Sequence, residues 1–201
     1  MSPQRLGLFG GSFDPVHSAH VALAQVALTQ LQLDAVRWVP AGQPWQKARE
    51  LASSAHRAAM VQLAIDHEPR FTLERCELDR VGPSYTLDTV RELQAATPGA
   101  QWFLIIGQDQ YAGLYSWRDW KALLQLVTLA VAMRPGAPSQ VNAEVEAEVE
   151  RVGHEPVALP MMDISSTEIR RRVARGQAIA GLVPAAVARY IDQHHLYRGN
   201  S

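Results

Sequence analysis

The chain has 201 residues, of which 47% are hydrophobic and 19% charged, and its formal net charge is −1. This length and composition predict a single domain over residues 1–201, with a C-terminal helical part, about 164–201, packed on it. The nearly balanced charge argues against a nucleic-acid partner, and a single cysteine, Cys76, excludes an internal disulfide and a multi-thiolate zinc site.

Short apolar runs alternate with helical patterns, which predicts βαβ units. The expected strands are residues 6–9, 36–40, 71–73, 101–106, 127–133 and 157–159. The expected helices are residues 21–31, 53–67, 84–96, 117–126, 144–152, 166–175 and 184–194. We therefore expect an α/β fold, Rossmann-like and doubly wound, with a mostly parallel sheet and helices on both faces. Ligands of such sheets bind beyond the carboxyl ends of the strands.

Two of these helices carry a prediction about which face is buried. In helix 53–67, Ala55, Ala59 and Leu63 are expected to face the core. Helix 144–152 has valines on one stripe and glutamates opposite, which is typical of a solvated surface helix. We assign His56 and Arg57 to structure or surface.

The chain also lacks the usual signals for export or for a membrane. It runs almost directly into the first strand, without a charged leader, an apolar stretch and a cleavage site. No apolar run reaches the roughly 20 residues that span a bilayer. We therefore expect a cytoplasmic protein with no membrane partner.

The stretch LFGGSFDPVHSAH, residues 8–20, follows the first strand. Gly10 and Gly11 lack a Cβ, so backbone N–H groups there can approach a ligand closely, and the next helix begins with unpaired N–H groups that attract anions. Neither the dinucleotide fingerprint nor the Walker A motif is present. His17 and His20 are three residues apart, which puts both rings on one side of the helix.

Each of these features has a simpler interpretation when taken alone. Two glycines are usually a turn, and two histidines usually lie on the surface. A zinc pair is the third alternative, but His17 and His20 have no third ligand at a supporting spacing. We therefore expect no metal site in the protein itself.

A second candidate anion site lies in ISSTEIR, residues 164–170. Ser165 and Glu168 form a capping box, which explains the helix start but not the other polar residues. Ser166, Thr167 and Arg170 add two hydroxyls and a cation at a helix N-terminus, a combination that suits phosphate.

Both stretches resemble signatures of the nucleotidylyltransferase superfamily, whose members transfer a nucleotidyl group from a nucleoside triphosphate. Residues 11–20 are similar to GxFDPxHxGH, with Ala19 where the family usually has glycine, and residues 164–170 are similar to ISSTxxR. The resemblance implies His17, His20 and Arg170 as catalytic residues. It implies ATP binding by Gly10, Gly11, Ser12, Phe13, Ile164, Ser165, Ser166 and Thr167, and by Gly107, Asp109 and Arg134 after later strands. For Arg134, a surface arginine that ends a strand stays an alternative.

The middle of the chain resembles the bacterial nicotinate-nucleotide adenylyltransferases, through GPSYT (82–86), IIGQD (105–109) and the dipeptide SW (116–117). This resemblance implies that Tyr85, Thr86 and Trp117 surround a nicotinate ring; taken alone, Trp117 is typical of a core and the hydroxyls of a helix cap. Lys47 keeps the lysine of the family's PPHK and would neutralise substrate phosphate. Trp45 and Gln46 replace its proline and histidine.

The implied reaction joins ATP and nicotinate mononucleotide to give nicotinate adenine dinucleotide and pyrophosphate in NAD biosynthesis. The mononucleotide phosphate is already a nucleophile, so direct in-line attack without a covalent intermediate is expected. Mg²⁺ would accompany ATP, held largely by water and phosphate oxygens. Phosphopantetheine adenylyltransferase and a non-catalytic nucleotide-binding sensor are the alternatives. The sequence leaves open the preference between the acid and amide mononucleotides, and the oligomeric state.

Overall fold

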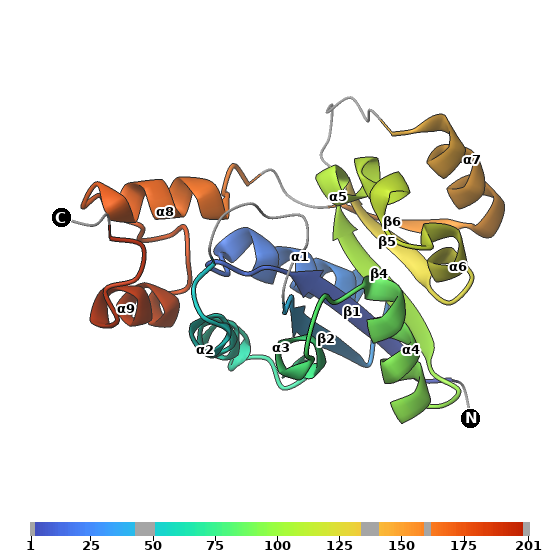
Figure 1. The fold of residues 1–201 in the computed structure, drawn as a ribbon, viewed down its shortest axis with the longest axis horizontal. Coiled ribbons are helices and arrows are strands. Elements are labelled where there is room, and N and C mark those ends of the chain that lie inside the picture. Colours follow the sequence, from blue (N-terminus) through green and yellow to red (C-terminus); the bar gives the residue numbers. More distant parts are fainter. Residues whose placement is uncertain (1–2, 43–50, 134–140, 159–161, 199–201) are drawn as a thin grey trace.

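The computed structural model describes residues 3–42, 51–133, 141–158 and 162–198 (Figure 1). Within these ranges, the strands form one six-stranded sheet in the order β3-β2-β1-β4-β5-β6, and every pairing is parallel. This order is that of a doubly wound α/β fold, in which the chain reverses its direction of travel between β1 and β4. The predicted Rossmann-like fold class is confirmed.

The strands are β1 Arg5–Gly11, β2 Ala35–Pro40, β3 Phe71–Leu73, β4 Gln101–Gly107, β5 Thr128–Met133 and β6 His154–Ala158. Both faces of β1 are buried: Leu6 and Leu8 point into one hydrophobic cluster and Phe9 into the other. The six predicted strands are confirmed. The last of them begins earlier than expected, and residue 159 lies outside the described residues.

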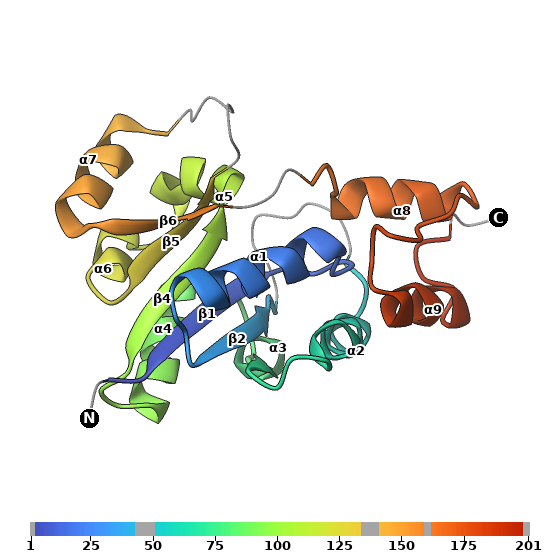
Figure 2. The ribbon, with the colours of Figure 1, turned by 180° about the vertical axis from the view of Figure 1, so that it is seen from behind.

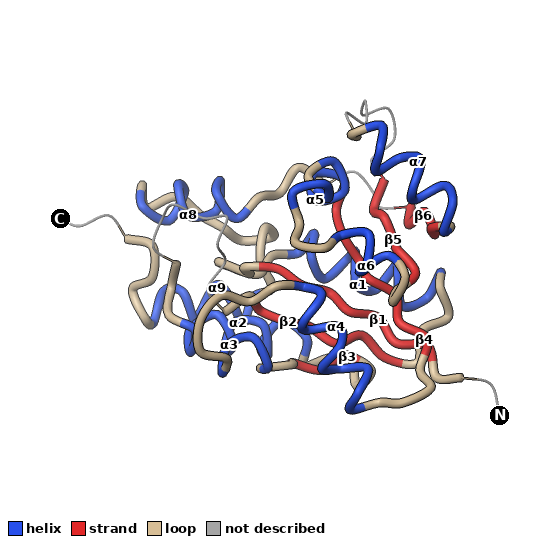
Figure 3. The backbone as a smooth tube through the Cα atoms, turned by 45° about the vertical axis from the view of Figure 1, so that its right-hand side comes forward, coloured by secondary structure: helices blue, strands red, loops and turns tan. Residues whose placement is uncertain are grey.

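The helices are α1 Ser18–Gln30, α2 Ser54–Ile65, α3 Cys76–Asp79, α4 Thr86–Ala96, α5 Gln108–Ala112, α6 Trp120–Leu124, α7 Ala143–Val152, α8 Ser166–Ala174 and α9 Ala185–Gln193, with the 3-10 helix Leu114–Ser116 after α5. Figures 1 and 2 view the sheet from opposite sides, with α4 in front of it in Figure 1 and α1 in Figure 2. Side chains of α1, α2, α8 and α9 join one cluster, and those of α4 to α7 join the other. Helices therefore cover both faces, as predicted, and Figure 3 shows the strands between them.

The predicted helix over residues 117–126 begins later than expected, since α6 starts at Trp120. Helix α5 begins directly after β4, and the 3-10 helix follows it. Trp117 lies in an extended conformation, with φ −78° and ψ 141°, between the 3-10 helix and α6. Helix α3 was not predicted, because its four residues are too few to show a helical period.

The predicted buried face of α2 is also wrong. Leu63 is 37% exposed, and the buried positions include Arg57, Met60 and Val61. The helix is rotated so that these larger side chains meet the sheet and α9, whereas the small alanines give little preference for a face. The prediction for α7 is confirmed: Val145 and Val149 are buried, and most of its glutamates are exposed.

The C-terminal helices share the core of the sheet domain. Ile169 of α8 and Val187 and Ile191 of α9 belong to the same hydrophobic cluster as Phe13 and α2. In Figures 1 and 2, α9 lies next to α2, and the two helices are in contact. Among the described helices, none combines the length and apolar character that a membrane span requires.

Candidate active site

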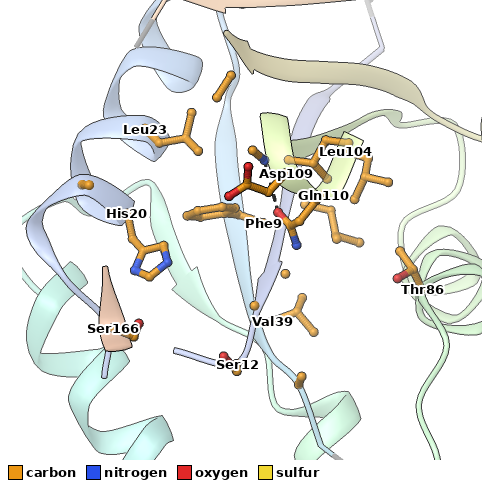
Figure 4. Close-up of a pocket in the computed structure, with 18 of the residues that line it drawn as sticks. Phe9, Ser12, His20, Leu23, Val39, Thr86, Leu104, Asp109, Gln110 and Ser166 are labelled. Carbon is orange, nitrogen blue, oxygen red and sulfur yellow. Dashed lines mark hydrogen bonds between the residues drawn. The ribbon is translucent and has the colours of Figure 1, made fainter. Parts of the chain in front are cut away.

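A cavity of about 550 Å³ opens where β1 and β4 end, at the point where the sheet changes direction. This is where doubly wound sheets bind ligands, and the volume is typical of a small-molecule site. Figure 4 shows His20 and Ser166 on one side of the cavity and Thr86 on the other, with Ser12 and Val39 between them. The cavity therefore has two ends, which are built from different parts of the chain.

Most residues predicted from the sequence line this cavity. They are Gly10, Gly11, Ser12, His17, His20, Tyr85, Thr86, Gly107, Asp109, Trp117, Ile164, Ser165, Ser166, Thr167 and Arg170. Lys47 and Arg134 lie outside the described residues. Phe13 is different: its ring is 1% exposed and belongs to the hydrophobic core behind the cavity.

Phe13 supports the cavity from behind. Its ring packs edge-on against Phe9 and His20, with centroid separations of 5.5 and 5.1 Å. A Cβ on Gly11 would lie 3.0 Å from this ring, so glycine is needed there for Phe13 to fold back under the loop. The ring of Phe13 therefore supports His20, and a contact between Phe13 and nucleotide stays a prediction.

His17 is the N-cap residue of α1 and is 6% exposed. Burial lowers the pKa of its imidazole to about 4, so the ring is neutral near pH 7. Its Nδ1 has no hydrogen-bond partner among the described residues. The His17 ring is therefore an uncharged part of the cavity wall near pH 7.

His20 is held in one orientation by its neighbours. Its ring stacks on that of His17 with centroids 3.5 Å apart, which confirms that the two rings lie on one side of the helix start. The backbone N–H of His17 donates to His20 Nδ1 over 3.2 Å. In the neutral ring the proton therefore sits on Nε2, which makes that nitrogen a donor.

Acidification from about pH 7.5 to about pH 5 is expected to lower the free energy of unfolding by about 2 kcal/mol through His17. The unfolded chain takes up this proton near pH 6.5 but the folded protein only near pH 4, so stability is lost as the pH falls between these values. Urea unfolding of the wild type and of His17→Asn at both pH values measures the difference. Asparagine caps helices well and does not titrate, so His17→Asn should lose less stability than the wild type between the two pH values. Equal losses in both proteins would show that His17 is not the source of the pH dependence.

The start of α8 is the second phosphate-binding candidate. Its N-cap residue is the predicted one, but the predicted capping box is only half formed, because the Glu168 carboxylate binds Arg171 and Arg172. Ser165 is the N-cap residue, and its Oγ accepts the N–H of Glu168 over 3.2 Å. This bond satisfies one of the N–H groups that a helix start leaves without a backbone partner. Ser166 and Thr167 line the cavity.

The two signature stretches are joined directly by hydrogen bonds. Ser166 Oγ donates to the Pro15 carbonyl over 2.9 Å, and Arg170 Nη1 donates to the Asp14 carbonyl over 2.6 Å. Arg170 Nη2 also donates to Thr167 Oγ1 over 3.0 Å. These bonds fix the position of a cation, Arg170, beside the loop of the first signature.

At the other end of the cavity, α4 begins without a side-chain cap. Tyr85 and Thr86 line the cavity there, together with Ser84. Ser84 is 9% exposed, and its Oγ lacks a hydrogen-bond partner within the described residues. A buried hydroxyl without a partner is unfavourable by about 1–3 kcal/mol, so this end is suited to a ligand with hydrogen-bonding groups.

Sequence reasoning missed several cavity residues, among them Arg118, Ser84 and Glu77. Arg118 lies over the Tyr85 ring, 4.6 Å from its centroid, and Ser84 appeared only as part of a helix cap. Glu77 belongs to the unpredicted α3; burial raises the pKa of its carboxyl, against the hydrogen bond from Thr89. The only signal for Arg118 was its place directly after Trp117.

Asp109 and Gly107 stand at the end of β4. The N–H of Gly107 donates to Gln110 Oε1 over 3.1 Å, which fixes the turn from β4 into α5 (Figure 4). Asp109 lies in the first turn of α5 and lines the cavity. The described residues contain no group of three or more His, Cys, Asp or Glu side chains placed to hold a metal ion.

A doubly wound sheet with two helix N-termini and an arginine beside its switch point is an arrangement suited to nucleotide phosphates. The cytidylyltransferase-like family model matches residues 8–172, so the chain is a nucleotidyltransferase. Two relatives, from Methylibium petroleiphilum and Bordetella petrii, are 51% and 49% identical and are each named "probable nicotinate-nucleotide adenylyltransferase". The matches cover 98% and 97% of this chain, and 94% and 100% of the relatives. The chain belongs to the nicotinate-nucleotide adenylyltransferase family.

The fold is also that of solved structures. The nicotinic acid mononucleotide adenylyltransferase of Plasmodium falciparum, complexed with NaAD, superimposes with a TM-score of 0.79 at 18% identity. This match covers 96% of this chain and 97% of that one. At this identity the likeness shows the fold alone.

Proposed function

We propose that the protein joins ATP and nicotinate mononucleotide to give nicotinate adenine dinucleotide and pyrophosphate. A phosphate oxygen of the mononucleotide attacks the α-phosphorus of ATP in line, and the bond from this phosphorus to pyrophosphate breaks, without a covalent enzyme intermediate. The observation that carries the proposal is one cavity with phosphate-binding groups at one end and, at the other, an uncapped helix N-terminus with Trp117.

The ATP phosphates are assigned to the end built by the two signatures. Charge grows on phosphate oxygens during the transfer, and preorganised donors stabilise it. Arg170 supplies a cation, His20 an Nε2–H donor, and the loop at Gly11 its backbone N–H groups. Mg²⁺ enters as part of the substrate Mg-ATP, bound by phosphate oxygens and water. Arg134 is a further candidate for nucleotide contact.

The mononucleotide is assigned to the end built by α4 and Trp117. The indole offers a flat face to the pyridine ring. The start of α4, with Ser84 and Thr86, offers N–H and O–H donors to a carboxylate. Lys47 is a candidate for the phosphate of the mononucleotide. This division places the two reacting phosphates between Ser12 and the start of α4.

Pyrophosphate release with Mg-ATP tests the proposal. Nicotinate mononucleotide, nicotinamide mononucleotide and phosphopantetheine are compared as acceptors in separate reactions. The proposal expects the highest kcat/KM with nicotinate mononucleotide. Turnover with phosphopantetheine alone would make the protein a phosphopantetheine adenylyltransferase. ATP binding without pyrophosphate release in any reaction would make it a nucleotide-binding sensor.

Trp117→Ala is expected to raise KM for nicotinate mononucleotide about tenfold or more, as the loss of one stacking face of about 1–3 kcal/mol would. KM for ATP should stay nearly unchanged, because the proposal assigns Trp117 to the mononucleotide end, where the neighbouring Arg118 lies over the Tyr85 ring. Trp120→Ala is the matched control, since Trp120 packs on the same hydrophobic cluster without lining the cavity. Equal changes in both KM values would identify Trp117 as a packing residue.

A further inference from the structure

Arg57 is a buried arginine directly behind the cavity. It is 2% exposed, although charged side chains are rarely buried unless they are fully hydrogen-bonded. Its described hydrogen bonds all run to backbone carbonyls: from Nε to Ala52 (3.1 Å), from Nη1 to Ser12 (3.0 Å) and Ala41 (2.7 Å), and from Nη2 to Gly42 (3.2 Å). One side chain thus connects the loop after β1, the loop after β2 and the segment before α2.

Two of these carbonyls come from residues of the cavity wall. Ser12 and Ala41 both line it, and they follow neighbouring strands at the carboxyl edge of the sheet. The guanidinium presents its donors in a planar and rigid fork, so it holds both carbonyls at a defined separation. A lysine at this position has a single ammonium, which cannot reproduce the fork.

The bond from Arg57 to Ser12 also sets the direction of the next N–H group. In a trans peptide the carbonyl and the following N–H point in opposite directions. Because the Ser12 carbonyl points inward to Arg57, the N–H of Phe13 is turned away from Arg57. The hydrogen bond from Arg57 to the Ser12 carbonyl therefore fixes the direction of the Phe13 N–H group in the loop after β1.

The backbone of this loop needs such support. Phe13 has φ 45°, in the left-handed region that residues with a Cβ avoid. A conformation of this kind persists only where surrounding contacts impose it. The neighbouring Asp14 is likewise anchored: its Oδ1 accepts the N–H of Ala52 (3.3 Å) and the hydroxyl of Tyr197 (2.6 Å), and its charge faces Arg57.

We propose that Arg57 is a positioning residue for the nucleotidyl transfer, which holds the Ser12–Phe13 peptide and the Ala41 loop in the arrangement that receives the ATP phosphates. It acts through these two loops and does not touch the substrate. This inference rests on the proposed function, because it assigns the ATP phosphates to the loop of the first signature.

The test compares Arg57→Lys with Arg5→Lys. Arg5 also binds backbone through its guanidinium, to the Leu31 carbonyl over 3.1 and 3.0 Å, but it lies at the start of β1, away from the cavity. Arg57→Lys should lower kcat by roughly 10²-fold, the loss typical of a small misplacement of reacting groups. KM for the mononucleotide should be unchanged. Arg5→Lys should leave kcat unchanged.

Hydrogen exchange provides a readout that does not depend on turnover. Amides of residues 10–14 should exchange faster in Arg57→Lys, while those of β4 and α4 keep the wild-type rate. Unchanged kcat or unchanged exchange in this loop overturns the inference, as does an Arg57→Lys chain that fails to fold while Arg5→Lys folds. A parallel rise of both KM values, with uniformly faster exchange, also overturns it. An inactive wild type would refute the proposed function instead, and loop exchange would still decide the role of Arg57.

Discussion

Replacing Arg170 with alanine is expected to lower kcat by about 10³-fold, the lower end of what an arginine contributes to phosphoryl transfer. The substitution removes the cation that lines the phosphate end of the cavity. It also removes the bond to the Asp14 carbonyl, so the loop of the first signature loses a support. Pyrophosphate release at saturating concentrations of both substrates measures the effect.

The matched control is Arg171→Ala, the next residue on α8. Arg171 pairs with Glu168 on the exposed side of the helix, and such a surface pair is worth little. The kcat of Arg171→Ala should equal that of the wild type. Arg170→Lys should recover only part of the activity, because an ammonium cannot bind Asp14 and Thr167 as the guanidinium does. Full activity of Arg170→Ala would remove Arg170 from the catalytic residues.

Removal of the His20 ring is expected to have the next largest effect, a fall in kcat of roughly 10²–10³-fold, or about 2.7–4 kcal/mol of transition-state stabilisation. The His17 N–H occupies Nδ1, so Nε2–H is the donor that His20→Ala deletes. The stacked His17 ring and the Phe13 edge hold this donor in place before the substrate arrives, which is why a single hydrogen bond carries so much.

His67→Ala is the control for His20, because His67 is exposed and lies just beyond α2. Both variants should show wild-type KM for the mononucleotide, and only His20→Ala should lose kcat. A near-normal kcat in His20→Ala would show that the ring has a packing role beside Phe13 and nothing more.

The strands of the sheet could be predicted from the sequence because of where they lie in the fold. Strands buried on both faces must be continuously apolar, as β4 is, so they stand out in the chain. The polar residues that follow them then meet at one edge of the sheet. This reasoning places Gly11 and Gly107 at one edge of the sheet, whereas Ser166 is assigned to the same site through the resemblance to ISSTxxR.

The parts that sequence could not supply depend on tertiary contacts. The residues next to Arg57 in the sequence do not show whether its guanidinium is exposed to water or bound to four backbone carbonyls. Ser84 differs from an ordinary helix cap only in that its hydroxyl is buried and unpaired. The ring of Phe13 is buried behind the cavity because Gly11 leaves room beneath the loop, a relation that spacing alone does not express.

The bonds that reach the first signature from the far end of the chain have a consequence for biosynthesis. Asp14 is held by Arg170 and by Tyr197, which follow it by 156 and 183 residues. A growing polypeptide emerges from the ribosome in order, so the glycine loop and its histidines appear long before their opposite wall exists. Catalytic competence therefore requires that the chain has been synthesised beyond Arg170, and nascent fragments that end before this residue should show no turnover, although they already have the βαβ core.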